Sequence, residues 1–114
     1  MQVRYLEVVT PDVDATCEVL SAIHQVTFGE PEPGLGNART AKLANGGTIG
    51  VRAPMHESEV PVVRPYLRVD DIEAAAAAAQ RAGAEIAHPP LEIPGHGTFA
   101  IYIQGGIQFG LWQD

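Results

Sequence analysis

The sequence is poor in features that would each assign it to a class of protein. Its 114 residues include one cysteine, Cys17, so an intramolecular disulfide framework is excluded. No apolar run approaches the roughly 20 residues that cross a bilayer, and no apolar signal segment follows Met1. We therefore predict a cytoplasmic protein of one domain.

Positive charge is also scarce. Seven Lys and Arg residues stand against 14 Asp and Glu residues, which gives a formal net charge of −7. This charge opposes binding to nucleic-acid phosphates and to anionic membranes, so we expect neither as a partner. Four of the few arginines lie in segments that are predicted to be strands, which makes them candidate site residues: Arg39, Arg52, Arg64 and Arg68.

The chain contains an internal repeat. When the sequence is shifted by 59 positions, Asp12 aligns with Asp71, Ala15 with Ala74, and Gly46-Gly47 with Gly105-Gly106. Such self-similarity indicates two related supersecondary units. We predict module one at residues 1–54, a polar linker at 55–61 and module two at 62–114.

Each copy is expected to form one strand, one helix and three further strands, an α+β arrangement written βαβββ. Thr10 is the expected cap of the first helix and Asp70 that of the second, which Gly83 would end. A stripe at helical spacing makes Cys17 a core residue. The further strands are expected at residues 25–28, 38–44, 48–53, 84–88, 98–104 and 107–112.

Alternation of side chains assigns a helix-facing side and an open side to these strands. The helix-facing set is predicted to be Phe99, Ile101, Ile103, Ile107, Phe109, Leu111, Ile49 and Val51. The open set is predicted to be Thr98, Ala100, Tyr102, Gln104, Gln108, Gly110, Trp112, Thr48, Gly50 and Arg52.

This pattern resembles a known superfamily. The second half, YLRVDDIEAAAAAAQRAGAEIAHPPLEIPGHGTFAIYIQGGIQFGLW, and the paired strand-to-helix turns are similar to the vicinal oxygen chelate superfamily, in particular a glyoxalase-like branch. Its members include glyoxalase I, extradiol dioxygenases and bleomycin resistance proteins. The resemblance implies two modules that form a curled mixed sheet around a central ligand-binding cup. It also implies a homodimer.

The resemblance further implies four metal-ligand positions, which this sequence does not fill with ligands. Metal-dependent members carry a His on the first strand of a module and a Glu on its last strand. The corresponding residues here are Tyr5, Arg64, Gly50 and Gly110. Neither glycine nor a guanidinium offers a lone pair to a cation, and Glu7 alone would not build a site. We therefore predict no metal and no cofactor.

The predicted site combines polar and aromatic residues of the open side. Glu7 is the candidate general base and His96, in a Gly-His-Gly loop, the candidate acid, although an exposed loop histidine is the alternative. His24, His56 and His88 are interpreted as a helix-end, a linker and a strand-end residue. The predicted ligand-binding residues are Tyr5, Arg52, Arg64, Tyr66, Arg68, Tyr102, Gln104, Gln108 and Trp112.

Three functional hypotheses remain open on this basis. The first is metal-independent binding of a small anionic or aromatic molecule, since arginine pairs with carboxylates and aromatic rings stack on planar groups. The second is an enzyme of the same fold, either metal-free or a metal-dependent lyase or dioxygenase. The third is a role in assembly. The sequence does not decide whether the protein catalyses a reaction.

Overall fold

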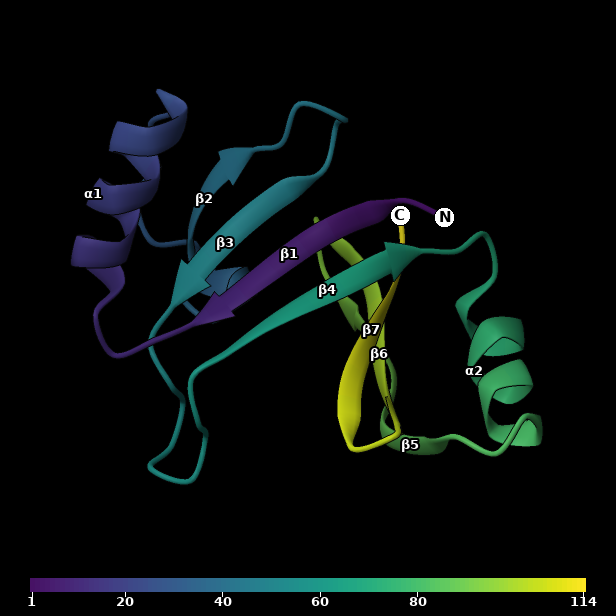
Figure 1. The fold of residues 1–114 in the computed structure, drawn as a ribbon. Helices are drawn as coiled ribbons and strands as arrows, with labels where there is room; N and C mark the ends of the chain where they lie inside the picture. Colours follow the sequence, from purple (N-terminus) through teal and green to yellow (C-terminus); the bar gives the residue numbers. More distant parts are fainter. The chain divides into compact units, whose positions relative to one another are not determined.

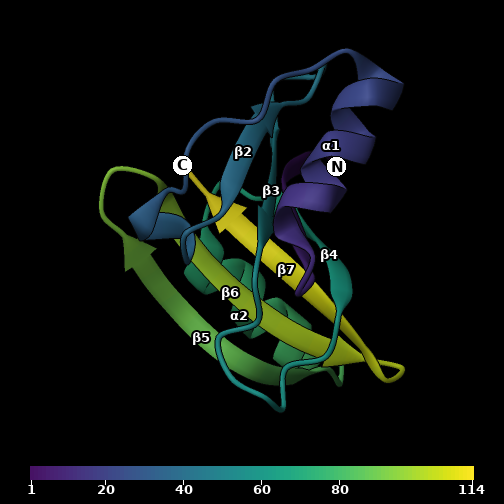
Figure 2. The same cartoon turned by 90° about the vertical axis from the view of Figure 1, so that its left-hand side faces the viewer.

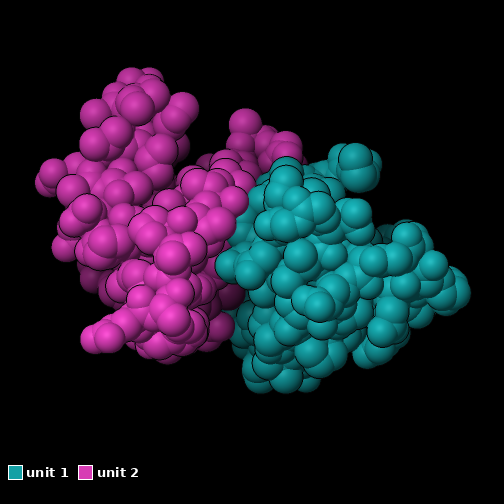
Figure 3. Space-filling model, turned by 60° about the horizontal axis from the view of Figure 1, so that its bottom comes forward, with its two compact units in different colours: residues 1–4, 64–114 teal, residues 5–63 magenta.

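The computed structural model describes residues 1–114 and divides into two compact units (Figure 3). Unit 2 comprises residues 5–63, and unit 1 comprises residues 1–4 and 64–114. Each unit carries one α-helix and a set of β-strands. No helix is both long enough and apolar enough to cross a membrane.

Unit 2 contains a three-stranded mixed sheet beside one helix (Figure 1). Its strands follow the order β2-β3-β1, in which β3 runs antiparallel to β2 and parallel to β1. The β1–β3 register places Tyr5 opposite Thr48 and Glu7 opposite Gly50. The elements are β1 (Val3–Val9, of which residues 5–9 lie in unit 2), α1 (Val13–His24), the 3-10 helix η1 (Pro33–Leu35), β2 (Arg39–Lys42) and β3 (Thr48–Arg52).

The apolar stripe of α1 packs on this sheet. Cys17 is buried with Phe28, Ala41 and Val51, which confirms its prediction as a core residue. Burial also raises the pKa of the Cys17 thiol, so it stays protonated at neutral pH. The cap prediction is wrong in detail: Asp12 is the N-cap, and Thr10 Oγ1 instead accepts a hydrogen bond from the Asp12 amide.

The strand predicted at residues 25–28 does not form. Gln25 leaves the helix in the left-handed conformation with φ 50°, and Phe28 turns its side chain into the core. The main chain then meets β2 at single points, through a bond from the Gly29 amide to the Thr40 carbonyl and an isolated bridge between Glu32 and Ala38. The first copy is therefore βαββ rather than βαβββ.

Unit 1 follows the predicted order of strand, helix and three strands (Figure 2). Its sheet has the order β4-β7-β6-β5, with β7 parallel to β4 and antiparallel to β6, and β5 antiparallel to β6. The elements are β4 (Val62–Arg68, of which residues 64–68 lie in unit 1), α2 (Ile72–Arg81), β5 (Glu85–Ile93), β6 (Gly97–Gln104) and β7 (Ile107–Gln113).

The ends of α2 follow ordinary capping chemistry, with one correction. Asp71, not Asp70, is the N-cap, and its carboxylate accepts a hydrogen bond from the Ala74 amide at 3.1 Å. The helix ends at Arg81, just before Gly83, whose φ of +106° suits a residue without a Cβ. The stop predicted at Gly83 is confirmed.

The side-chain faces of β6 are the reverse of the prediction. Ala100 is buried with Ile72 and Leu111 beneath α2, and Tyr102 packs against this cluster. Phe99 lies opposite Trp112, so it belongs to the other face. The set Thr98, Ala100, Tyr102 and Gln104 is the more polar of the two, yet the small Ala100 lets the alanine-rich helix pack against it, so hydrophobicity alone points to the wrong face. The predicted faces of β7 are confirmed at Leu111.

Candidate functional site

The face of the unit 1 sheet that points away from α2 carries an aromatic floor, defined as Tyr66, Phe99 and Trp112. Tyr66 and Trp112 are buried, with exposed fractions of 4% and 3%. Their rings meet edge to face with centroids 6.0 Å apart, and Tyr66 meets Phe99 in the same way at 6.2 Å. Phe99 stays partly exposed. The two buried rings therefore support Phe99 as an accessible aromatic surface.

Two glycines make room for the buried rings. A Cβ built on Gly110 would overlap the Tyr66 ring, which lies directly over the glycine to which it is paired in the β4–β7 register. A Cβ on Gly97, whose φ is +145°, would stand 2.6 Å from Trp112 Nε1. Any side chain at either position would displace the floor.

Polar groups lie at one end of this floor. Arg64 is buried; its Nε donates to Gln108 Oε1 at 3.0 Å, and its Nη1 donates to the Tyr66 hydroxyl at 3.4 Å. These bonds orient the guanidinium beside the aromatic rings. The structure thus brings together four of the predicted residues: Arg64, Tyr66, Gln108 and Trp112.

Unit 2 carries a charged cluster on its sheet. Arg52 is 5% exposed, and its Nε donates to Glu7 Oε2 at 2.8 Å. The other two guanidinium nitrogens donate to Glu59, from Nη1 at 2.9 Å and from Nη2 at 2.7 Å. This bidentate pair is the strongest geometry available to an arginine. Arg52 is therefore held by carboxylates of its own chain, and Glu7 serves as one of its counter-ions.

Glu59 was not among the predicted site residues, because its segment was predicted to be a polar linker. Hydrogen bonding from Arg52 lowers the pKa of Glu59 to about 2, with a further contribution from the Met55 amide. The same contact with Glu59 raises the pKa of Arg52 above its ordinary value. No pattern in residues 54–61, PMHESEVP, predicts that this carboxylate is partly buried, because a loop has no periodic alternation of buried and exposed side chains.

The four metal-ligand positions implied by the resemblance carry a tyrosine, an arginine and two glycines, and the space beside each glycine holds a tyrosine side chain. A Cβ on Gly50 would overlap the Tyr5 hydroxyl, as one on Gly110 would overlap Tyr66. A carboxylate at either glycine would thus require a tyrosine to move. No group of three or more His, Cys, Asp or Glu side chains is placed to hold a metal ion.

Two predicted ligand-binding residues lie away from the aromatic floor, and a third, Arg68, lies at its edge, opposite Trp112 in the β4–β7 register. Tyr102 stacks on Phe109 with ring centroids 5.3 Å apart on the α2 side, and Gln104 follows at the exposed end of the same strand. Arg68 is about half exposed and pairs with Asp114 through its Nε at 3.3 Å.

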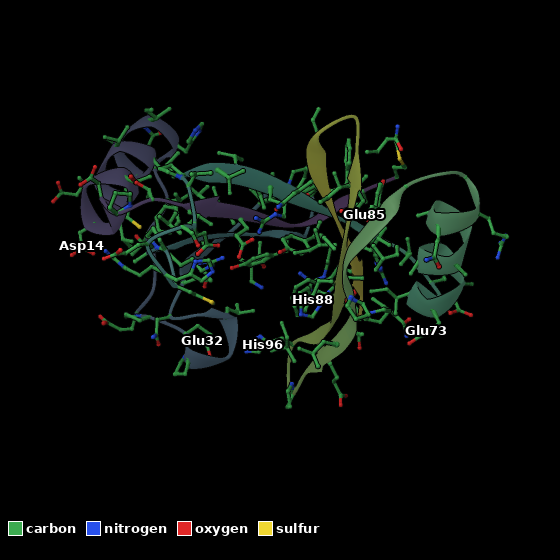
Figure 4. All side chains as sticks on the ribbon, turned by 90° about the horizontal axis from the view of Figure 1, so that it is seen from below. Asp14, Glu32, Glu73, Glu85, His88 and His96 are labelled. Carbon is green, nitrogen blue, oxygen red and sulfur yellow. The ribbon has the colours of Figure 1, made fainter.

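Two histidines of unit 1 lie at and after β5 (Figure 4). His96 occupies the turn that follows β5, and its amide donates to the Ile93 carbonyl. His88 lies within β5, and its ring contacts the Phe99 ring with centroids 4.7 Å apart. The two prolines that follow His88 predict a strand end there, yet β5 continues through both prolines with register shifts.

The chain has an α+β fold of the glyoxalase and bleomycin resistance type, as the sequence resemblance predicts. It is similar to a hypothetical protein from Bacillus halodurans, with a TM-score of 0.80, 10% identity, and coverage of 99% of this chain and 94% of that chain. It is also similar to methylmalonyl-CoA epimerase from Mycobacterium tuberculosis, with a TM-score of 0.74, 16% identity and coverage of 96% and 85%.

A third similar structure is a variant of Streptomyces coelicolor methylmalonyl-CoA epimerase in complex with 2-nitronate-propionyl-CoA. Its TM-score is 0.70, its identity 15%, and the coverage is 100% of this chain and 97% of that chain. No family model and no curated protein matches the sequence. At these identities the likeness establishes the fold alone.

Proposed function

We propose that the protein binds a small anionic or aromatic molecule on the aromatic floor of unit 1, without a metal ion. The observation that carries this proposal is that tyrosine side chains occupy the space beside Gly50 and Gly110, where metal-dependent relatives are expected to carry a ligand. A divalent cation needs several carboxylate or imidazole ligands at one point, and the side chains at these positions supply none.

The aromatic character of the ligand follows from Phe99. This ring is partly exposed and is fixed edge-on by buried neighbours, so it offers a rigid surface to a planar group at little cost in side-chain entropy. The anionic character is supported by Arg64, whose guanidinium lies at one end of the same face. A guanidinium recognises a carboxylate through charge and through its planar donor geometry.

Related folds are consistent with a small ligand. Methylmalonyl-CoA epimerase structures that resemble this chain hold 2-nitronate-propionyl-CoA or methylmalonyl-CoA. Those compounds combine an anionic acyl group with a larger carrier. For this chain we propose the simpler class, an aromatic carboxylate, because a partly exposed aromatic ring shares this face with Arg64, and both contact Tyr66.

Benzoate provides a direct test. The chain has one tryptophan, so the indole N–H resonance of Trp112 reports on the floor without ambiguity. Titration of EDTA-treated protein with benzoate is expected to shift this resonance. Cyclohexanecarboxylate should produce the same shift only at about five-fold higher concentration, because the loss of one aromatic contact weakens binding by about that factor. A requirement for added Zn, Fe, Mn or Ni, or no shift with either compound, would overturn the proposal.

Two matched variants locate the binding. Phe99→Leu is expected to abolish the preference for benzoate over cyclohexanecarboxylate, because it replaces the accessible ring with an aliphatic side chain. Phe109→Leu makes the same change on the α2 side, where Phe109 stacks on Tyr102, and should leave the preference intact. Equal effects of the two variants would place the ligand elsewhere.

A further inference from the structure

His88 has one ring nitrogen engaged by the main chain. Its Nδ1 lies 2.7 Å from the carbonyl oxygen of Pro89. A carbonyl oxygen accepts hydrogen bonds and never donates them, so Nδ1 must carry the proton. The neutral ring is then the Nδ1–H tautomer, in which Nε2 holds a lone pair. The protein main chain thus fixes His88 as a hydrogen-bond acceptor through Nε2.

The position of this ring is set by the strand. His88 packs on Phe99 with an interplanar angle of 32°, so it shares the face of the aromatic floor rather than the face of α2. Nε2 is the ring nitrogen farther from the main chain, and His88 is partly exposed. An acceptor therefore stands beside the partly exposed ring of Phe99.

We propose that His88 Nε2 accepts a hydrogen bond from a hydroxyl group of a ligand stacked on Phe99, so that the preferred ligands are phenols. This inference rests on the proposed function and makes its ligand class narrower. A phenol supplies both parts of the recognition, since its ring stacks and its O–H donates. An aromatic compound of the same shape without a donor leaves Nε2 without that bond, which weakens binding.

The tautomer is tested first, without any ligand. Long-range 1H–15N correlation spectra of the full chain at pH 8 distinguish the two neutral forms of each histidine. The Nδ1–H form is expected for His88. A dominant Nε2–H form would overturn the proposal, because Nε2 would then donate.

Ligand selectivity is tested with pairs of similar size. We expect 3- or 4-hydroxybenzoate to bind about five-fold more tightly than the corresponding fluorobenzoate, as one neutral hydrogen bond implies. His88→Phe retains a ring against Phe99 and should bind the fluorobenzoate as before while losing the preference for the hydroxyl compound. His96→Phe, the matched change in the turn after β5, should keep that preference.

The outcomes separate the two proposals. If benzoates bind and shift Trp112 but His88→Phe keeps the full preference for the hydroxyl group, the role of His88 is wrong and the proposed function stands. If no hydroxybenzoate is preferred over its fluoro partner in the parent protein, the phenol class is wrong. If no benzoate binds at all, the proposed function fails and the inference fails with it.

Discussion

The two units of this protein use one structural device for different chemistry. In both, a tyrosine of the opening strand lies over a glycine of the closing strand: Tyr5 over Gly50 in unit 2, and Tyr66 over Gly110 in unit 1. In unit 2 the strand that carries this tyrosine also carries Glu7, which pairs with Arg52. In unit 1 the tyrosine packs against the rings of Phe99 and Trp112. A repeated fold unit therefore fixes where a side chain stands but not what it does.

The largest difference between the units should appear when the charged cluster is broken. Arg52→Ala removes the guanidinium that neutralises Glu7 and Glu59, and we expect a loss of about 3–5 kcal/mol in the free energy of unfolding. Asp14→Ala removes the exposed partner of Arg39 and should cost less than about 1 kcal/mol. Urea denaturation measures both. Equal losses of unfolding free energy in the two variants would show that the buried ion pairs of Arg52 stabilise the protein no more than the exposed pair of Arg39.

The two tyrosine–glycine pairs should respond differently to an added methyl group. Gly110→Ala presses on the base of the Tyr66 ring, which cannot swing away, and is expected to cost about 3 kcal/mol. Gly50→Ala presses on the far end of Tyr5, and we expect a smaller cost of about 1–2 kcal/mol.

The hydroxyl of Tyr5 provides the control for this comparison. Tyr5→Phe removes the atom that a Cβ at Gly50 would meet first, so it should relieve part of the cost of Gly50→Ala. The combined variant is measured by the same urea titration. Strict additivity of the two changes would show that the contact is absent in solution.

Acid should weaken the charged cluster selectively. The pKa of Glu59 is about 2 in the folded state and 4.5 ordinarily, so the unfolded chain binds more protons between these values. The stabilisation is complete above about pH 5 and is lost as pH falls toward 2, with a size of about 2 kcal/mol for this partly solvated group. Glu59→Gln should be less stable at pH 6 and should lose correspondingly less on acidification. Parallel stability curves would contradict the assignment.

The smallest effect compares the two helix starts. Asp71→Ala removes a side-chain cap and should cost about 1 kcal/mol, while Asp71→Asn retains an acceptor and should cost less. Asp12 makes no side-chain capping bond, so Asp12→Ala should be close to neutral. Thermal unfolding of the three variants measures these losses of stability. A larger loss for Asp12→Ala than for Asp71→Ala would contradict the assignment of the side-chain cap to Asp71.

Local patterns predicted much of each unit correctly. The repeat indicated the superfamily resemblance, the helical stripe identified Cys17 as core, and alternation gave the faces of β7. Prediction failed at residues 25–28, where a core contact of Phe28 overrides strand pairing, and on β6, where the more polar set of side chains faces α2. It also missed Glu59 and His88, whose importance depends on partners distant in sequence or on the path of the strand.

The sequence by itself determined both helices and most of the strands, because periodicity and side-chain propensity are local properties that need no knowledge of neighbours. Tertiary structure alone decided that Arg52 is held by Glu7 and Glu59, that Tyr66 lies over Gly110, and that His88 meets Phe99. These contacts join residues from different strands and loops, and their energies arise only when folding brings the groups within a few ångströms of one another.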